Sequence, residues 1–366
     1  MDSSQSVSAG KVVKERFALG TQWPTIDPFL FVAHHRDRYP PGNDRLGPTE
    51  SLAGRQLGMD FSYLDGWSMY HGQVVPGFPQ HPHRGFETIT HVREGFVDHS
   101  DSLGATARFS RGDTQWMTAG AGVVHAEMFP LLETDVDNPL EMFQIWLNLP
   151  ASDKMVDPYF TMFWADATPT IGHTTDTGSV EATIIAGQKP PQVVTPEGEL
   201  LEVDLASPPP PPPNSWAAQP QSEVGVWYLR LAGSSTLQLP AAERPDTRRI
   251  VYVFAGSRLN VAAADGSGQQ TIDAGTGFEV ATDEPVNLSV EHGEVECIVL
   301  SGHPINEPVA RYGPFVLNDQ QGIQQAFEDY QRTGFGGWPW PSEAPVHHRD
   351  QARFARHADG RVETRS

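Results

Sequence analysis

The stretch from His81 to Glu127 begins HPHRGFETITHV and ends HAE. Side chains at positions i and i+2 of a β-strand point to the same face of its sheet. His81 and His83 therefore form one pair, and His125 and Glu127 form a second pair. If the two strands are neighbours, three imidazoles and one carboxylate converge on one point. Such a ligand set suits a borderline divalent metal such as iron, manganese, nickel, copper or zinc.

The source of the carboxylate is open at this stage. Glu87 follows His83 by four residues, so an unbroken strand would place it on the same face. Either Glu87 or Glu127 can then supply the carboxylate, or Glu87 can orient one of the histidines. The alternation of side chains along the strand does not decide between these alternatives, because a bulge at Arg84-Gly85 would shift the alternation by one residue. Pro82 removes a backbone donor, which suits the start or the edge of a sheet.

The region around these pairs is rich in short strands. Residues 58–148 contain β-forming runs such as Phe86–Val92 and Glu141–Asn148, separated by turn signals at Asp101–Gly104 and Arg111–Asp113. The whole chain has 34 glycines and 32 prolines, which favours many turns over long helices. Closely spaced short strands are typical of a barrel or a sandwich.

The strand-rich block recurs later in the chain. Ile89–Gly112 reads ITHVREGFVDHSDSLGATARFSRG, and Ile250–Gly275 reads IVYVFAGSRLNVAAADGSGQQTIDAG. Gly95 aligns with Gly256, and the turn glycines that close the two blocks also align. We therefore expect two copies of one β-barrel unit.

The repeat predicts that only the first copy holds a metal. Counting from the aligned glycines gives the four positions that correspond to the histidines and the glutamate. These positions hold Ala242, Arg244, Leu288 and Val290. None of these is a plausible ligand, so we expect one metal ion per chain and a structural role for the second barrel.

Three further segments have readable patterns. Residues 36–56 are charged and rich in proline and glycine, which predicts a long surface loop. Pro208–Pro213 must be polyproline II, and we interpret it as a stiff strap between two halves of the protein. Apolar residues between Asp319 and Arg332 recur at helical spacing, with Asn318 or Asp319 as a cap and Gly334 as a stop signal.

Composition and charge exclude several functions. The formal net charge is −21, and such an acidic surface repels phosphate backbones, so we expect no direct nucleic-acid binding. The single cysteine, Cys297, lies in an apolar run and is expected to be a buried core thiol. We see no secretory signal and no stretch of about 18 apolar residues, so we expect no membrane association and a cytoplasmic location.

These residues carry a resemblance. His81–Thr88, Gln115–Gly120 and His125–Glu127 resemble the signatures of the pirin family within the cupin superfamily, and Tyr312–Asn318 resembles its C-terminal motif. The resemblance implies an all-β protein with two cupin-type β-barrels, a bicupin, and a short C-terminal helix. It divides the chain into a lead-in, a metal-binding barrel, a connection with the polyproline strap, a metal-free barrel, and a C-terminal helix and tail. The corresponding ranges are 1–24, 25–155, 156–221, 222–310 and 311–366.

The resemblance also assigns the ligands and a chemistry. It implies that His81, His83, His125 and Glu127 hold the metal, that Glu87 is not a ligand, and that the metal is Fe(II). Some pirins resemble quercetin 2,3-dioxygenases, which implies a dioxygenase that takes dioxygen and a flavonol-like aromatic.

Four protein ligands leave up to two positions free on a six-coordinate metal, and Glu127 can instead act as a general base for the flavonol proton. Phe86, Trp116 and Met117 either line the barrel mouth, where they can hold a flat aromatic, or belong to the core. Eukaryotic pirins are described as nuclear transcription cofactors, so the alternative is a non-enzymatic, metal- or redox-responsive regulator that binds a protein partner. A third possibility is a different cupin reaction, such as an isomerisation.

Overall fold

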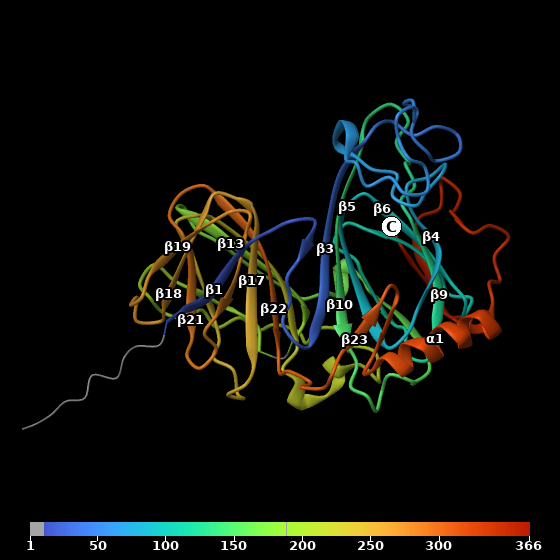
Figure 1. Ribbon diagram of the computed structural model, residues 1–366. Helices are drawn as coiled ribbons and strands as arrows, with labels where there is room; N and C mark the ends of the chain where they lie inside the picture. Colours follow the sequence, from blue (N-terminus) through green and yellow to red (C-terminus); the bar gives the residue numbers. More distant parts are fainter. Residues whose placement is uncertain (1–10, 188) are drawn as a thin grey trace, which may run out of the picture. The chain divides into compact units, whose positions relative to one another are not determined.

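The computed structural model describes residues 11–187 and 189–366 of the chain and shows a largely β-sheet protein with one α-helix (Figure 1). The described residues form two compact units. We call residues 29–166, 211–218 and 305–366 the N-terminal unit, and residues 11–28, 167–187, 189–210 and 219–304 the C-terminal unit. Single-turn 3-10 helices lie at Leu64–Gly66, Ala165–Ala167, Trp216–Ala218, Pro220–Ser222 and Gly334–Gly336.

The C-terminal unit is built on two antiparallel sheets. In one sheet the strands are ordered β1-β20-β17-β22-β15-β13-β12, and in the other β14-β16-β21-β18-β19. Its strands are β1 (Val13–Ala18), β2 (Gln22–Trp23), β12 (Thr170–Thr174), β13 (Gly178–Ala186), β14 (Gln192–Val194), β15 (Gly225–Gly233), β16 (Ser235–Leu239), β17 (Arg248–Gly256), β18 (Arg258–Ala263), β19 (Gln270–Asp273), β20 (Thr276–Val280), β21 (Val286–Val290) and β22 (Glu294–Gly302).

The C-terminal unit contains a large cluster of buried apolar side chains. Leu288 and Val290, at the positions that the repeat aligns with His125 and Glu127, are buried in this core. Cys297 belongs to the same core, as expected, and burial raises the pKa of its thiol. Removal of this apolar surface from water stabilises the unit, and no ligand is needed to account for its packing.

The N-terminal unit contains the residues of the sequence motif. One sheet holds β11, β8, β5, β10 and β3 in this order, and the other is ordered β26-β25-β7-β6-β9-β4. Its strands are β3 (Phe29–Tyr39), β4 (Gly77–His83), β5 (Phe86–Glu94), β6 (Phe96–Asp101), β7 (Thr106–Ser110), β8 (Thr114–Thr118), β9 (Val123–Met128), β10 (Asn138–Asn148), β11 (Tyr159–Phe163), β23 (Ala310–Tyr312), β24 (Phe315–Leu317), β25 (Arg353–Arg356) and β26 (Val362–Arg365).

The expected turns and helix are confirmed. Asp101 ends β6, and its Oδ1 accepts hydrogen bonds from the backbone N–H groups of Leu103 and Ala105, which closes the turn. The helix α1 spans Gln320–Thr333. Asp319 caps its first turn by accepting from the backbone of Gly322, and Gly334 ends it in the left-handed conformation.

One expected boundary is wrong. Residues 36–56 were expected to form a loop, but β3 continues to Tyr39 and pairs with β10 over this length. The charged residues at positions 36–38 favoured a surface loop in the sequence, but Asp37 is buried in the strand. Its carboxylate accepts from the Tyr70 hydroxyl at 2.8 Å and from the backbone N–H of Ser68 at 2.9 Å. These bonds satisfy a polar group whose burial would otherwise be costly.

The last thirty residues of the chain lie against the sheet that contains β4, β9 and β6. Trp340 Nε1 donates to the backbone carbonyl of Asp101, at the end of β6. Arg108 is fully buried and forms two 2.7 Å bonds with the Asp98 carboxylate. Its remaining donors bond backbone carbonyls between His347 and Gln351. A buried ion pair therefore fastens the C-terminal tail, residues 337–366, to the sheet.

None of the helices in the described part of the chain is both long and apolar enough to cross a membrane.

Candidate metal centre

The two sequence pairs come together on neighbouring antiparallel strands, β4 and β9 (Figure 1). His81 lies directly opposite His125, after a register irregularity between Phe78 and His81. One ring nitrogen from each of His81, His83 and His125 lies within 4.8 Å of the other two. Each pair of imidazole centroids is 4.4 to 4.9 Å apart. No other group of three or more His, Cys, Asp or Glu side chains this close occurs among the residues that the structure describes.

The hydrogen bonds of the imidazoles leave nitrogens free for a metal. His81 Nδ1 lies 2.8 Å from the Pro79 carbonyl oxygen, and His83 Nδ1 lies 3.4 Å from that of Pro314. A carbonyl only accepts, so Nδ1 carries the proton and Nε2 keeps a lone pair. Both ring nitrogens of the fully buried His125 have no hydrogen-bond partner in the described structure. An unsatisfied buried imidazole is costly, and a metal ion would bind its lone pair.

The charge state of the three imidazoles also fits a metal. Burial lowers the pKa of His81 to about 4 and lowers the pKa values of His83 and His125 well below the ordinary value. All three are therefore neutral near pH 7, which is the form that binds metals. The residues present thus fit a divalent metal held by three neutral imidazoles.

Glu127 lies beside this group. Its Oε2 is 3.8 Å from His125 Nε2, and the carboxylate is outside the set of atoms that lie within 4.8 Å of one another. Thr90 donates to Oε1 at 3.1 Å, and Gln144 donates to Oε2 at 2.7 Å. The two donors fix the carboxylate next to the imidazoles while leaving lone pairs on both oxygens.

Two residues that the sequence reasoning did not select complete the surroundings. On β6, His99 lies opposite Glu127 and Asp101 lies opposite His125. His99 Nε2 lies 3.1 Å from Asp101 Oδ2, and both side chains are fully buried. The signal was present in the sequence, because His99-Ser100-Asp101 has the same i, i+2 spacing as the two recognised pairs.

Glu87 points away from the three imidazoles. β5 pairs with β8 in continuous register over residues 87–91, so Glu87 and Thr90 lie on opposite faces of the strand. Thr90 contacts Glu127, whereas Glu87 accepts a 2.6 Å bond from Thr118 and a 2.5 Å bond from Ser215. Ser215 lies just after the polyproline run, so Glu87 anchors this segment to the N-terminal unit.

Glu87 gives the fold a testable pH dependence. Burial raises the pKa of its carboxyl from 4.5 to about 7. The native state then holds this proton more tightly than the unfolded state, so stability falls as the pH rises from about 4.5 to about 7. Glu87→Gln is expected to remove this dependence and to be more stable than the wild type above pH 7, by about 3 kcal/mol at most.

The measurement is urea unfolding of both proteins at about pH 5 and about pH 8. The exposed Glu284, in the C-terminal unit, provides the matched control as Glu284→Gln. The proposed titration of Glu87 is contradicted if Glu87→Gln and the wild type differ in stability by the same amount at both pH values.

The aromatic and apolar surroundings of the site differ in part from expectation. The Phe86 ring lies 5.0 Å from the His83 ring, and Met117 lies opposite Thr88 on the inner face. Trp116 lies opposite Ile89, on the same face of the sheet as Glu87, and packs on Phe163. The structure therefore places Phe86 and Met117 on the side of the imidazoles and Trp116 on the other side.

Two further aromatic residues accompany Phe86. The Trp146 ring lies 4.2 Å from the Phe86 ring and 5.5 Å from the His83 ring. The Phe31 ring lies 5.1 Å from that of Trp146. Their sequence signals are weak, because each lies in an apolar run that reads equally well as a buried strand.

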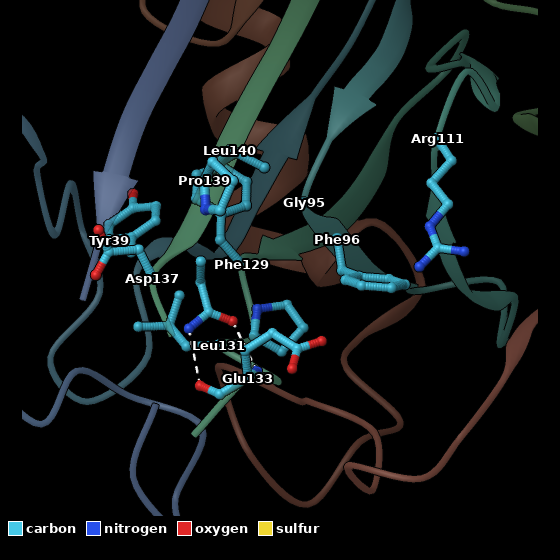
Figure 2. A pocket seen from close by; sticks show the side chains of 12 residues that line it. Tyr39, Gly95, Phe96, Arg111, Phe129, Leu131, Glu133, Asp137, Pro139 and Leu140 are labelled. Atoms are coloured by element: carbon cyan, nitrogen blue, oxygen red, sulfur yellow. Dashed lines mark hydrogen bonds between the residues drawn. The ribbon is translucent and has the colours of Figure 1, made fainter. Parts of the chain in front are cut away.

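A separate hollow in the N-terminal unit has a volume of about 140 Å³ (Figure 2). Tyr39 and Arg111 lie on opposite sides of it, and Phe96 lies between them. Asn138 closes one wall by bonding the backbone of Glu133. The hollow contains none of the histidines of the site, and it is smaller than the pockets that usually hold drug-sized molecules.

Two family models match the chain. The model described as Pirin matches residues 11–147, and the model described as Pirin C-terminal cupin domain matches residues 226–336. The first match contains all four proposed ligands. The C-terminal tail lies beyond both matches.

Relatives and solved structures agree with these matches. A Pseudomonas aeruginosa protein named "Putative quercetin 2,3-dioxygenase" is 32% identical over 70% of this chain and 79% of its own length. A pirin-like protein from Caulobacter vibrioides is 32% identical over 71% of this chain and 80% of its own.

The crystal structure of a quercetin 2,3-dioxygenase from Acinetobacter baumannii superimposes with a TM-score of 0.63 at 25% identity. It covers 90% of this chain and 99% of the other. The expected fold, all-β with two cupin domains and a short C-terminal helix, is confirmed. The chain belongs to the pirin family.

Proposed function

We propose that this pirin is an Fe(II)-dependent dioxygenase that acts on a flavonol-like aromatic, in the manner of a quercetin 2,3-dioxygenase. The observation that carries the proposal is the cluster of three neutral imidazoles with free ring nitrogens, of which His83 and His125 are buried and His81 is half-buried. The names of the relatives support the same chemistry. The donor set also suits manganese, nickel, copper or zinc, and iron is the choice that dioxygen chemistry favours.

The proposed roles follow from the contacts of each residue. His81, His83 and His125 hold the metal through ring nitrogens, and Glu127 is the fourth ligand or accepts the proton of the substrate hydroxyl. Thr90 and Gln144 hold the Glu127 carboxylate in place for either role. When bound, Fe(II) supplies Lewis acidity and redox chemistry.

The aromatic side chains near His83 are proposed to hold the substrate. Phe86, Trp146 and Phe31 form a continuous set of rings that begins 5.0 Å from the His83 imidazole. Flat aromatic molecules pack favourably on such rings. Phe86 and Trp146 are buried and therefore also exclude water from one side of the metal centre.

The test is oxygen uptake by the iron-loaded protein with quercetin. We expect uptake that depends on both iron and quercetin, and none above background from His83→Ala loaded in the same way. The oxygen electrode reports uptake directly, and analysis of the products then identifies the ring that is opened. If the wild type and His83→Ala consume oxygen at the same rate, the dioxygenase proposal is wrong.

One observation favours the alternative, a metal-responsive regulator that binds a protein partner. Large apolar side chains are exposed along the loop that follows β3, which is typical of a surface that contacts another protein. They are Leu57, Met59, Phe61, Tyr63 and Leu64. A protein that binds iron at the three histidines yet consumes no oxygen with quercetin would favour this second function.

A further inference from the structure

A short hairpin joins the C-terminal part of the N-terminal unit to the strand that carries His83. The hairpin consists of β23 and β24, and its residue Phe315 bridges to Arg84. The backbone N–H of Val316 donates to the Arg84 carbonyl at 3.0 Å. The Pro314 carbonyl accepts from His83 Nδ1. These contacts fix the hairpin next to the proposed metal centre.

The hairpin places the guanidinium of Arg311 over the aromatic residues of the site. The guanidinium carbon lies 4.7 Å from the centroid of the Trp146 ring and 5.3 Å from that of Phe31. The His83 imidazole lies 5.5 Å from the same indole ring. Arg311 and His83 therefore both lie within 6 Å of one indole ring.

The indole is itself held in place. Trp146 Nε1 donates to Gln144 Oε1 at 3.2 Å, and Gln144 Nε2 donates to Glu127 Oε2 at 2.7 Å. The position of the guanidinium is thus coupled through Trp146 and Gln144 to the carboxylate beside the imidazoles.

Arg311 has no anionic partner among the described residues. Within the described part of the chain, no carboxylate lies within ion-pair distance of Arg311 and no acceptor bonds its N–H groups. Other arginines near the site are paired, as Arg84 is with Asp329 and Arg108 is with Asp98. Stacking on aromatic rings engages the face of a guanidinium and leaves its in-plane donors available.

We propose that Arg311 is a specificity-determining residue that selects aromatic substrates carrying an anionic oxygen remote from the atoms that reach the metal. A carboxylate and an ionised phenol both present such an oxygen, and both match the donors of a guanidinium. The aromatic body packs along Trp146 and Phe31, while the anionic oxygen meets Arg311. This inference rests on the proposed use of the site for an aromatic substrate, and it names the charge which that substrate carries.

The experiment measures binding rather than turnover, so it remains informative if the protein does not oxidise quercetin. Two probe pairs of matched shape differ in charge: 2-naphthoate with 2-naphthamide, and 4-nitrophenolate with 4-nitroanisole at a pH where the phenol is ionised. Dissociation constants of the iron-loaded protein, kept free of oxygen, are measured by calorimetry. Wild type is expected to bind the charged member of at least one pair about tenfold more tightly. A preference in the naphthoate pair identifies a carboxylate as the group that Arg311 binds, and a preference in the nitrophenolate pair identifies an ionised phenol.

Variants of Arg311 separate charge from packing. Arg311→Gln is expected to bind both members of a pair equally, Arg311→Lys to keep part of the preference, and Arg311→Glu to reverse it. Salt should weaken the wild-type preference, because the guanidinium is partly exposed. The matched control is Arg258→Gln, which removes an exposed arginine of the C-terminal unit. The proposal is overturned if the wild type binds charged and neutral probes equally or binds no probe at all. It is also overturned if Arg311→Gln keeps the wild-type preference.

Discussion

His125→Ala is expected to lose the bound metal and with it all quercetin-dependent oxygen uptake. His125 lies opposite His81, and neither of its ring nitrogens forms a hydrogen bond within the described structure. Loss of a residue that merely orients a ligand costs about 10- to 100-fold in metal affinity, so loss of a ligand should cost more than about 100-fold. Elemental analysis should give one metal ion per chain for the wild type and none for the variant.

The matched control for this variant is His348→Ala. His348 lies in the C-terminal tail and its side chain is 82% exposed, so its removal should leave the metal content unchanged. A His125→Ala protein that retains one metal per chain would show that the imidazole cluster is not the site. Two metals per chain in the wild type would contradict the expectation that the C-terminal unit holds none.

Arg108→Met is expected to lower the free energy of unfolding by about 3 to 5 kcal/mol. The change leaves the Asp98 carboxylate buried without its ion pair and frees the backbone carbonyls of the tail that Arg108 bonds. Urea unfolding of the metal-free protein measures the loss. Limited proteolysis should at the same time show faster cleavage between residues 337 and 352, because the tail is no longer fastened to the sheet.

The double variant Asp98→Leu/Arg108→Met separates an unpaired charge from lost packing. It leaves no buried charge without a partner, so it should be more stable than Arg108→Met alone. Arg258→Met, which removes an exposed ion pair with Asp273, should change stability by less than about 1 kcal/mol. If Arg108→Met is no more destabilised than Arg258→Met, the buried ion pair does not hold the tail.

The sequence was sufficient for features that depend on local periodicity. The i, i+2 spacing within the pairs His81/His83 and His125/Glu127 predicted that each pair shares one face of its strand. The structure brings the three histidine side chains together. The repeated glycines predicted two similar units, and both Gly95 and Gly256 adopt positive φ angles at the ends of strands. Short-range sterics fix both patterns, so they can be read without knowing the rest of the fold.

Features that depend on distant partners could not be read in this way. Residue spacing alone left Glu87 and Glu127 as equivalent candidates for the carboxylate. The register of β5 shows that Glu87 lies on the opposite face of the strand from Thr90, which contacts Glu127. Asp37 appeared to belong to a charged loop, because its bonds to Ser68 and Tyr70 come from a segment about thirty residues away. The contact of Arg108 with the tail spans about 240 positions and leaves no local pattern in the sequence.

The placement of the two chain ends has a consequence for biosynthesis. The first described strand, β1, pairs with β20 near residue 280, and β25, which joins the sheet of the proposed ligands beside β7, begins at Arg353. A ribosome releases the chain from its N-terminus onward, so β1 cannot complete this pairing until residue 280 has emerged. The barrel that bears the histidines reaches its final form only after β25 and β26, which span residues 353–365, have emerged. Nascent chains stalled before residue 353 should therefore present that barrel with an open sheet edge, a state prone to pairing with other strands.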